Sequence, residues 1–81
     1  MEDSLNKRKL LAKAERSPNN LSFAEFVSLV EAFGFRLKRQ RGSHHVFSCP
    51  QVAQIMDVQP EGGKAKRYQV EQLLDLVERY G

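Results

Sequence analysis

Residues 35–48 read Phe35-Arg-Leu-Lys-Arg-Gln-Arg-Gly-Ser-His-His-Val-Phe-Ser48, and this stretch decides the fold class. Its first four positions alternate between apolar and basic residues, which predicts a strand over residues 35–40 with one apolar and one basic face. Arg41-Gly42-Ser43 predicts a tight hairpin turn, because glycine adopts the backbone angles that such turns need. The segment 44–48 then forms a second strand, antiparallel to the first.

Outward from this hairpin, the sequence predicts a third strand and two flanking helices. Residues 54–59, closed by Pro60, form the third strand. On the amino-terminal side, Ser22 and Glu25 have the spacing of a capping box, and Gly34 predicts the end of that helix. Apolar spacing predicts that this helix buries Phe23, Phe26, Val27, Val30 and Phe33. A last helix, from about Arg67 to the end, is predicted to bury Val70, Leu73, Leu74, Val77 and Tyr80.

Two segments are less regular. Residues 5–16 favour helix by propensity but present only a thin apolar stripe, so we expect a helical arm that docks weakly or not at all. Residues 17–20 interrupt it, since Pro18 cannot continue a helix. Residues 61–66 are expected to be a flexible basic loop.

The order of helix, three-stranded antiparallel sheet and helix defines an α+β fold with two layers. The helices cover one face of the sheet, and the other face stays open to solvent, where a ligand would bind. We expect residues 1–20 to be an arm with its linker, and residues 21–81 to be the functional domain.

Size and composition exclude several classes of protein. With 81 residues, 41% of them hydrophobic, the chain is one small domain without room for a separate cofactor domain. No apolar run approaches the ~20 residues of a membrane span, and no signal-peptide pattern follows the amino terminus. The single cysteine agrees with a cytoplasmic protein, and with only two histidines we expect neither a metal site nor a cofactor.

The formal net charge of +3 is distributed unevenly. Three basic clusters are formed by Arg36, Lys38, Arg39 and Arg41, by Lys64, Lys66 and Arg67, and by Lys7, Arg8, Lys9, Lys13 and Arg16. Such clusters are typical of proteins that bind polyanions, although a solvated charged surface explains the net charge equally well.

Gly42-Ser43-His44-His45 is the motif best suited to chemistry. A histidine can accept or deliver a proton at cellular pH, and Arg or Lys beside it can hold a phosphate. RNA supplies its own nucleophile, the 2′-hydroxyl, so its cleavage needs a base, a cation and an acid but no metal. Neighbouring strand residues point to opposite faces, so we expect His44 on the open face and His45, with Phe47, toward the helices.

Other residues carry weaker signals. Ser43 can orient a phosphate or only cap the turn. For His45 we expect a packing or hydrogen-bonding role rather than a catalytic one. Cys49 is expected to fill a small apolar space. Gly62-Gly63-Lys64 is too short for a phosphate-binding P-loop. Tyr68 is open to base stacking, but packing at the start of the last helix is the simpler interpretation.

Gly34-Phe35, the run from Arg39 to Phe47 and the Leu-rich last helix together resemble the HicA (YcfA-like) toxins of bacterial and archaeal toxin–antitoxin pairs. The resemblance covers about residues 21–81. It implies a fold like that of the double-stranded-RNA-binding domain and a metal-independent ribonuclease activity on mRNA. It also implies a HicB-type antitoxin that covers the active face. The catalytic histidine of the family falls on His44, with Gly42 and Ser43 shaping its turn.

The candidate site of such an endoribonuclease has His44 as general base or acid and His45 as a secondary candidate. The predicted RNA-binding residues are Lys38, Arg39, Arg41, Gly42, Ser43, Lys64, Lys66 and Arg67. Many family members have a second histidine just after a proline beyond the third strand, whereas here Glu61-Gly62-Gly63 follows Pro60. Two other hypotheses stay open: an RNA-binding module that does not cut, and a protein-interaction domain whose basic face binds an acidic partner.

Overall fold

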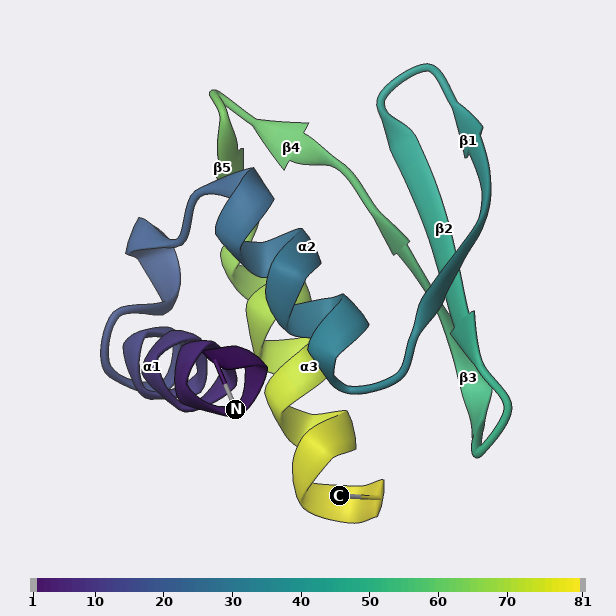
Figure 1. Ribbon diagram of the computed structural model, residues 1–81. Helices are drawn as coiled ribbons and strands as arrows, with labels where there is room; N and C mark the ends of the chain where they lie inside the picture. The colour runs from purple at the N-terminus through teal and green to yellow at the C-terminus, as the bar shows by residue number, and fades with distance from the viewer. Residues whose placement is uncertain (1, 81) are drawn as a thin grey trace.

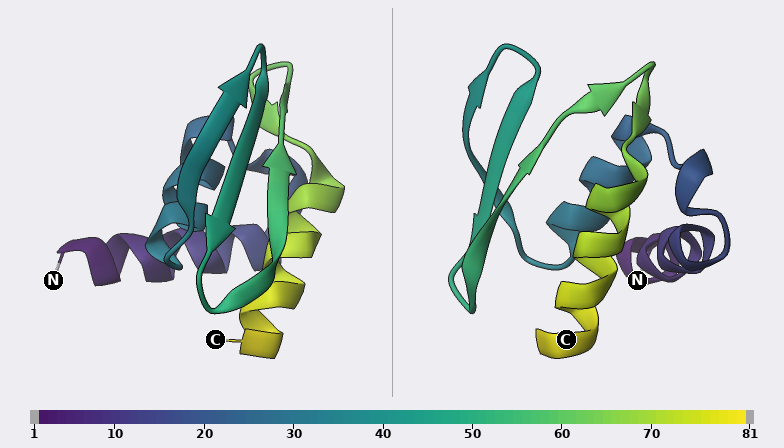
Figure 2. Two further views of the ribbon diagram at one scale, coloured as in Figure 1. Left: turned by 90° about the vertical axis from the view of Figure 1, so that its right-hand side faces the viewer. Right: turned by 180° about the vertical axis from the view of Figure 1, so that it is seen from behind.

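The computed structural model describes the backbone of residues 2–80 and the side chains of residues 7–80. Its elements are α1 (Glu2–Arg16), a short 3₁₀ turn η1 (Pro18–Asn20), α2 (Phe23–Ala32), β1 (Arg36–Arg41), β2 (His44–Cys49), β3 (Val52–Val58), β4 (Pro60–Glu61), β5 (Lys64–Ala65) and α3 (Arg67–Tyr80). Helices α2 and α3 cover one face of the antiparallel sheet β1-β2-β3 (Figures 1 and 2). The predicted α+β fold, with the helix–sheet–helix layout of a double-stranded-RNA-binding domain, is confirmed. No helix within residues 2–80 has the length and apolar character needed to cross a membrane.

Local signals explain where α2 begins and ends. Ser22 Oγ accepts the backbone N–H of Glu25 at 3.1 Å, and the Glu25 carboxylate accepts the backbone N–H of Ser22 at 3.0 Å. This is the predicted capping box. The bond from the Ser22 backbone, followed by that from the Lys13 side chain, lowers the pKa of the Glu25 carboxyl below its usual value. Gly34 follows the helix at φ 98°, the left-handed conformation that favours glycine.

The core lies between the sheet and the pair α2 and α3. β2 is the central strand, and its buried Phe47 pairs with Leu37 of β1 and Met56 of β3. In α3 the fully or almost fully buried apolar residues are Val70, Leu73 and Leu76. The prediction that Tyr80 belongs to this buried face is wrong, because the last turn of α3 runs beyond α2 and leaves Tyr80 51% exposed (Figure 1).

Helix α1 packs on the side of α2 and α3 that faces away from the sheet (Figure 2). Ala14 is completely buried there, and Lys13 Nζ lies 2.9 Å from Glu25 Oε1. Lys7 Nζ lies 4.1 Å from the centre of the Phe33 ring. The expectation of an arm that docks weakly or not at all is therefore wrong. The apolar stripe of this segment includes Ala14, but a count of apolar residues leaves out the contacts of the two lysine side chains.

Residues 60–65 form a short hairpin, β4–β5, instead of the flexible loop that the sequence predicts. Pro60 pairs with Ala65, and Glu61 pairs with Lys64 across a Gly62-Gly63 turn. The hairpin is also bonded to the segment before α2, since the Ala65 N–H donates to the Leu21 carbonyl at 3.1 Å. The bond to Leu21 joins segments far apart in the chain, so the glycine-rich local sequence could not reveal it.

Candidate functional site

An irregularity in β1 places two arginines on the same face as His44. Arg41 is directly opposite His44, and Arg39 is opposite Val46, with a bulge between Leu37 and Arg39. Directly opposed residues of an antiparallel pair lie on the same face of the sheet. Without the extra residue, strict alternation would put Arg39 beside Leu37, on the face that turns toward the helices. The bulge therefore brings Arg39, Arg41 and His44 together on the open face.

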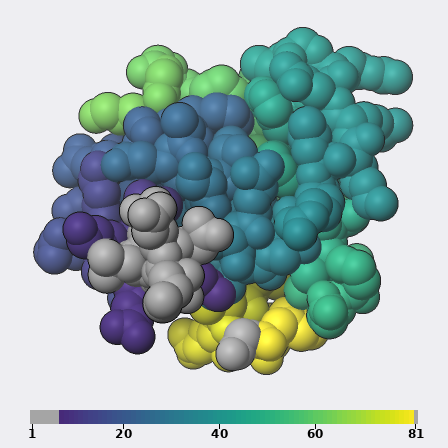
Figure 3. Space-filling view, viewed as in Figure 1, coloured from purple at the N-terminus to yellow at the C-terminus, as the bar shows by residue number. Residues whose placement is uncertain are grey.

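This open face forms one side of the molecule. In the space-filling view, the teal side chains of β1 and β2 project at the right, away from the helices (Figure 3). Every residue of β1 is exposed, including Lys38 at the bulge. Gly42, at φ 59°, and Ser43 form the two-residue turn that ends this face. The predicted site residues of the hairpin are thus all accessible to a large ligand.

His44 is held at one ring nitrogen and free at the other. Its Nδ1 lies 3.1 Å from Oδ1 of Asp57, and both side chains are 53% exposed. Asp57 is opposite Val46 in the register of β2 and β3, which puts it on the open face with His44. Within residues 7–80, the Nε2 atom of His44 has no hydrogen-bond partner. This atom is available to a ligand.

His45 has a different environment, on the side of the sheet that faces the helices. Its Nδ1 donates to the Ser43 carbonyl at 2.9 Å, and its ring centre lies 5.0 Å from that of Phe23 in α2. The side chain is half-buried. These contacts are those of a residue that fixes the hairpin against α2.

A chain of amide and hydroxyl contacts connects α3 to the hairpin turn. Gln69 is 2% exposed; its Nε2 donates to the Asp57 carbonyl at 3.1 Å, and its Oε1 accepts the Gln59 N–H at 3.3 Å. The Gln59 side chain donates to Ser43 Oγ at 3.1 Å and accepts from Lys66 Nζ at 3.4 Å. Lys66 is thereby connected through one glutamine to the turn before His44.

The second basic cluster lies at the same end of the molecule as the β1–β2 turn (Figures 1 and 2). Lys64 is exposed on β5, and Lys66 is half-buried. Arg67 Nε pairs with the Glu71 carboxylate at 3.0 Å, so part of its charge is already compensated. Tyr68 is 63% exposed beside them, and the prediction that it packs at the start of α3 is wrong. A shallow hollow of about 470 Å³ is lined by Lys66, Arg67 and Tyr68 together with Glu61 and Glu71.

Sequence reasoning missed Asp57, Gln59 and Gln69. Met56 and Val58 are buried, and this alternation places Asp57 between them on the open face. That signal was readable in the sequence. The strand register that sets Asp57 beside His44 was not, because it depends on how three strands pair.

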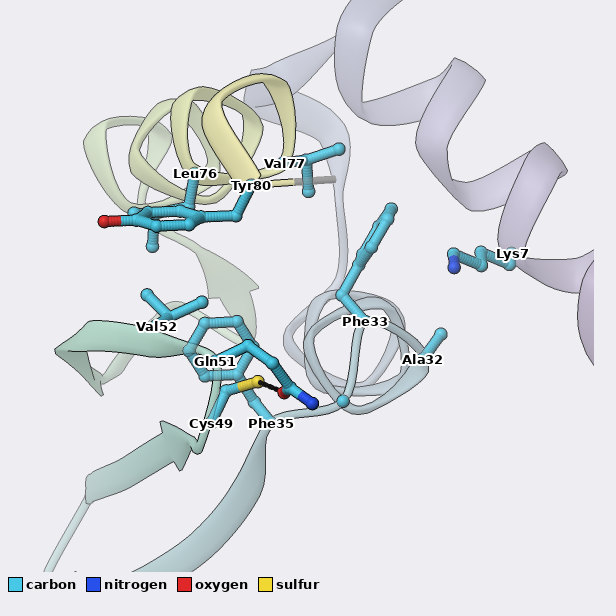
Figure 4. Close-up of a pocket in the computed structure, with 11 residues that line it drawn as sticks. Lys7, Ala32, Phe33, Phe35, Cys49, Gln51, Val52, Leu76, Val77 and Tyr80 are labelled. Atoms are coloured by element: carbon cyan, nitrogen blue, oxygen red, sulfur yellow. Dashed lines mark hydrogen bonds between the residues drawn. The ribbon is translucent and has the colours of Figure 1, made fainter.

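A separate cavity of about 420 Å³ lies between the ends of α2 and α3 and the β2–β3 turn, with Lys7 of α1 at one side (Figure 4). Its lining is mostly apolar, and the Cys49 thiol there donates to Gln51 Oε1 at 3.1 Å. Cys49 is 6% exposed, as expected of a small core residue. Within the part of the chain that the structure describes, no three His, Cys, Asp or Glu residues are grouped to hold a metal.

By fold and site, the chain is a small helix–sheet–helix protein of the double-stranded-RNA-binding-domain type, with a basic sheet face around an exposed histidine. A family model described as the HicA toxin of bacterial toxin–antitoxin systems matches residues 23–77. This match covers more than half of the chain, so the chain belongs to the HicA toxin family, as the sequence resemblance predicted. Neither a search of curated proteins nor one of solved structures found a match. α1 lies outside the matched residues.

Proposed function

We propose that this HicA toxin is an endoribonuclease that cleaves mRNA without a metal ion, with His44 as the catalytic base. One observation carries the proposal: the unoccupied Nε2 of an exposed imidazole lies on the same sheet face as Arg39 and Arg41. Toxins of this family act in toxin–antitoxin pairs. The proposed protein partner is a HicB-type antitoxin that covers this face.

The chemistry uses groups that are present on this face. Nε2 of His44 takes the proton of an RNA 2′-hydroxyl, and the 2′-oxygen attacks the adjacent phosphorus. The bond from phosphorus to the 5′-oxygen breaks, and a solvent water molecule protonates that oxygen. The hydroxide that remains takes the proton from Nε2 of His44, which restores the base. Arg39 and Arg41 stabilise the negative charge that develops on the phosphate. The products are a 2′,3′-cyclic phosphate and a free 5′-hydroxyl.

The second basic cluster extends this contact along the RNA backbone. Of the cations in this cluster, Lys66 is the best-supported RNA contact, because Gln59 connects it to Ser43 in the hairpin turn. Lys64 is exposed at the same end of the molecule, and Arg67 contributes the charge that Glu71 leaves uncompensated. A phosphate next to the scissile one is the ligand that these cations fit.

A non-catalytic RNA-binding module is the second candidate, and the environment of His45 favours it. The chain has two histidines, and His45 is engaged by the Ser43 carbonyl and Phe23. No second imidazole is therefore placed to protonate the leaving oxygen. Binding would then depend on phosphate contacts alone.

Product analysis separates the two candidates. The purified protein is incubated with mRNA in the presence of a chelator, and the RNA ends are examined by mass spectrometry. Fragments with 2′,3′-cyclic phosphate and 5′-hydroxyl ends support the nuclease. Intact RNA that shifts with the protein in an electrophoretic assay supports the binding module and contradicts the nuclease.

Removal of Arg39 and Arg41 together is expected to weaken RNA binding and its salt dependence. For single-stranded RNA, two lost phosphate contacts reduce the slope of log K against log salt by about 1.4. The measurement is a salt titration of binding to RNA with 2′-O-methyl groups, which cannot be cleaved. The matched control replaces Arg8 and Arg16, both exposed on α1. Equal losses from the two double variants would mean that net charge, and not this face, governs binding.

A further inference from the structure

We propose that Asp57 is a positioning residue for His44: it keeps the proton of the neutral imidazole on Nδ1 and leaves Nε2 free to act as the base. The inference deepens the proposed ribonuclease function, and its catalytic part rests on that function. The placement of the proton is a property of the protein alone. It can be measured without RNA.

The contact between the two side chains determines which ring nitrogen carries the proton. Nδ1 of His44 and Oδ1 of Asp57 are 3.1 Å apart. An ionised carboxylate only accepts hydrogen bonds, so Nδ1 is the donor of this pair. The other nitrogen of a neutral imidazole then has a free lone pair. Nε2 is therefore the atom that can take a proton from RNA.

The strand that carries Asp57 is fixed from the helical layer. The buried Gln69 side chain donates to the carbonyl of Asp57 and accepts the N–H of Gln59. Both contacts are made to the β3 backbone and its end, so they do not depend on the side chain at position 57. A substitution of Asp57 can therefore change the carboxylate without moving the strand.

The charge of Asp57 distinguishes a catalytic role from simple RNA binding. A carboxylate on the same sheet face as Arg39 and Arg41 weakens the attraction of this face for phosphate. It favours catalysis, however, because it stabilises the imidazolium that forms when Nε2 takes a proton. The positioning role thus predicts slower cleavage without weaker binding when the charge is removed.

Asp57→Asn tests this prediction directly. The amide can donate to Nδ1, which would move the imidazole proton to Nε2. ¹⁵N chemical shifts of the His44 ring should show the proton mainly on Nδ1 in the parent protein and a shift toward Nε2 in the variant. Single-turnover cleavage should fall by about 10-fold to 100-fold, less than for loss of the base because the pair is exposed. Affinity for 2′-O-methyl RNA should stay equal or increase.

Two further variants keep the result interpretable. Asp75→Asn makes the same charge change on α3, where Asp75 pairs with Arg79, and should leave the His44 spectrum and the cleavage rate unchanged. Asp57→Glu retains a carboxylate and should recover part of the lost rate. A rate that falls in step with RNA affinity would point to a structural role and overturn the proposal.

Failure of the inference and failure of the proposed function give different results. If the parent protein does not cleave RNA but its His44 proton moves as described, the positioning of the imidazole holds and the ribonuclease function is wrong. If RNA is cleaved and neither the ring spectrum nor the rate responds to Asp57→Asn, the function holds and the role of Asp57 is wrong.

Discussion

His44→Ala is expected to lower the rate of RNA cleavage by about 10²-fold to 10⁴-fold, the usual contribution of a general base. The loss follows from removing Nε2 of His44. Among residues 7–80 this nitrogen has no hydrogen-bond partner, and it lies on the open face. Folding should be almost unaffected, because the side chain is 53% exposed. Cleavage of mRNA in a chelating buffer and the thermal unfolding midpoint measure the two effects. Growth inhibition by the expressed toxin should disappear in parallel.

His45→Ala is the control, since it removes the same ring from the neighbouring position. It should retain most of the cleavage activity but lose about 1–2 kcal/mol of unfolding free energy, because the bond to the Ser43 carbonyl and the contact with Phe23 disappear. The opposite pattern, with activity lost at position 45 and retained at position 44, would place catalysis on the side of the sheet that faces the helices. It would contradict the proposed role of His44. Equal cleavage by His44→Ala and the parent protein would end the nuclease proposal.

Phe47→Ala is expected to lower the free energy of unfolding by about 3–5 kcal/mol, the range for removing a buried aromatic side chain. Phe47 is 1% exposed on the central strand, between Leu37 and Met56. Truncation leaves a cavity under α2 and α3 that the neighbouring strands cannot fill. The total free energy of unfolding of a domain is only about 5–15 kcal/mol, so this substitution would remove a large part of it. Urea unfolding followed by circular dichroism measures the change.

Ile55→Ala tests the other face of the same sheet. Ile55 is 57% exposed on β3, and its truncation should change stability by no more than about 0.5 kcal/mol. A comparable loss from both variants would show that the open face is covered in solution. That result would also remove the surface on which His44, Arg39 and Arg41 are proposed to meet RNA.

The two faces of the sheet therefore differ in role: one stabilises the fold and the other carries the candidate site. Side chains toward α2 and α3, such as Phe47, Met56 and Val58, stabilise the domain. On the open face, Arg39, Arg41, His44 and Asp57 are exposed and are expected to contribute little to stability, so this face can carry charge and a reactive imidazole. This separation explains why site variants of this protein are expected to remain folded.

Much of the candidate site was readable from local sequence. Alternation along a strand was enough to predict that His44 faces solvent and His45 faces the helices. It could not place Arg39, because the bulge after Leu37 moves it to the other face. It also could not find the contact between His44 and Asp57, since 13 positions separate these residues along the chain.

The sequence by itself determined the elements whose signals are local. The capping box of α2, its glycine end and the Gly42-Ser43 hairpin turn each depend on a few neighbouring residues and their backbone angles. Only the tertiary structure decided the packing of α1, the attachment of the β4–β5 hairpin to Leu21 and the strand register that brings Asp57 to His44. These features arise from contacts between segments far apart in the chain, where the free energy of packing outweighs local preference.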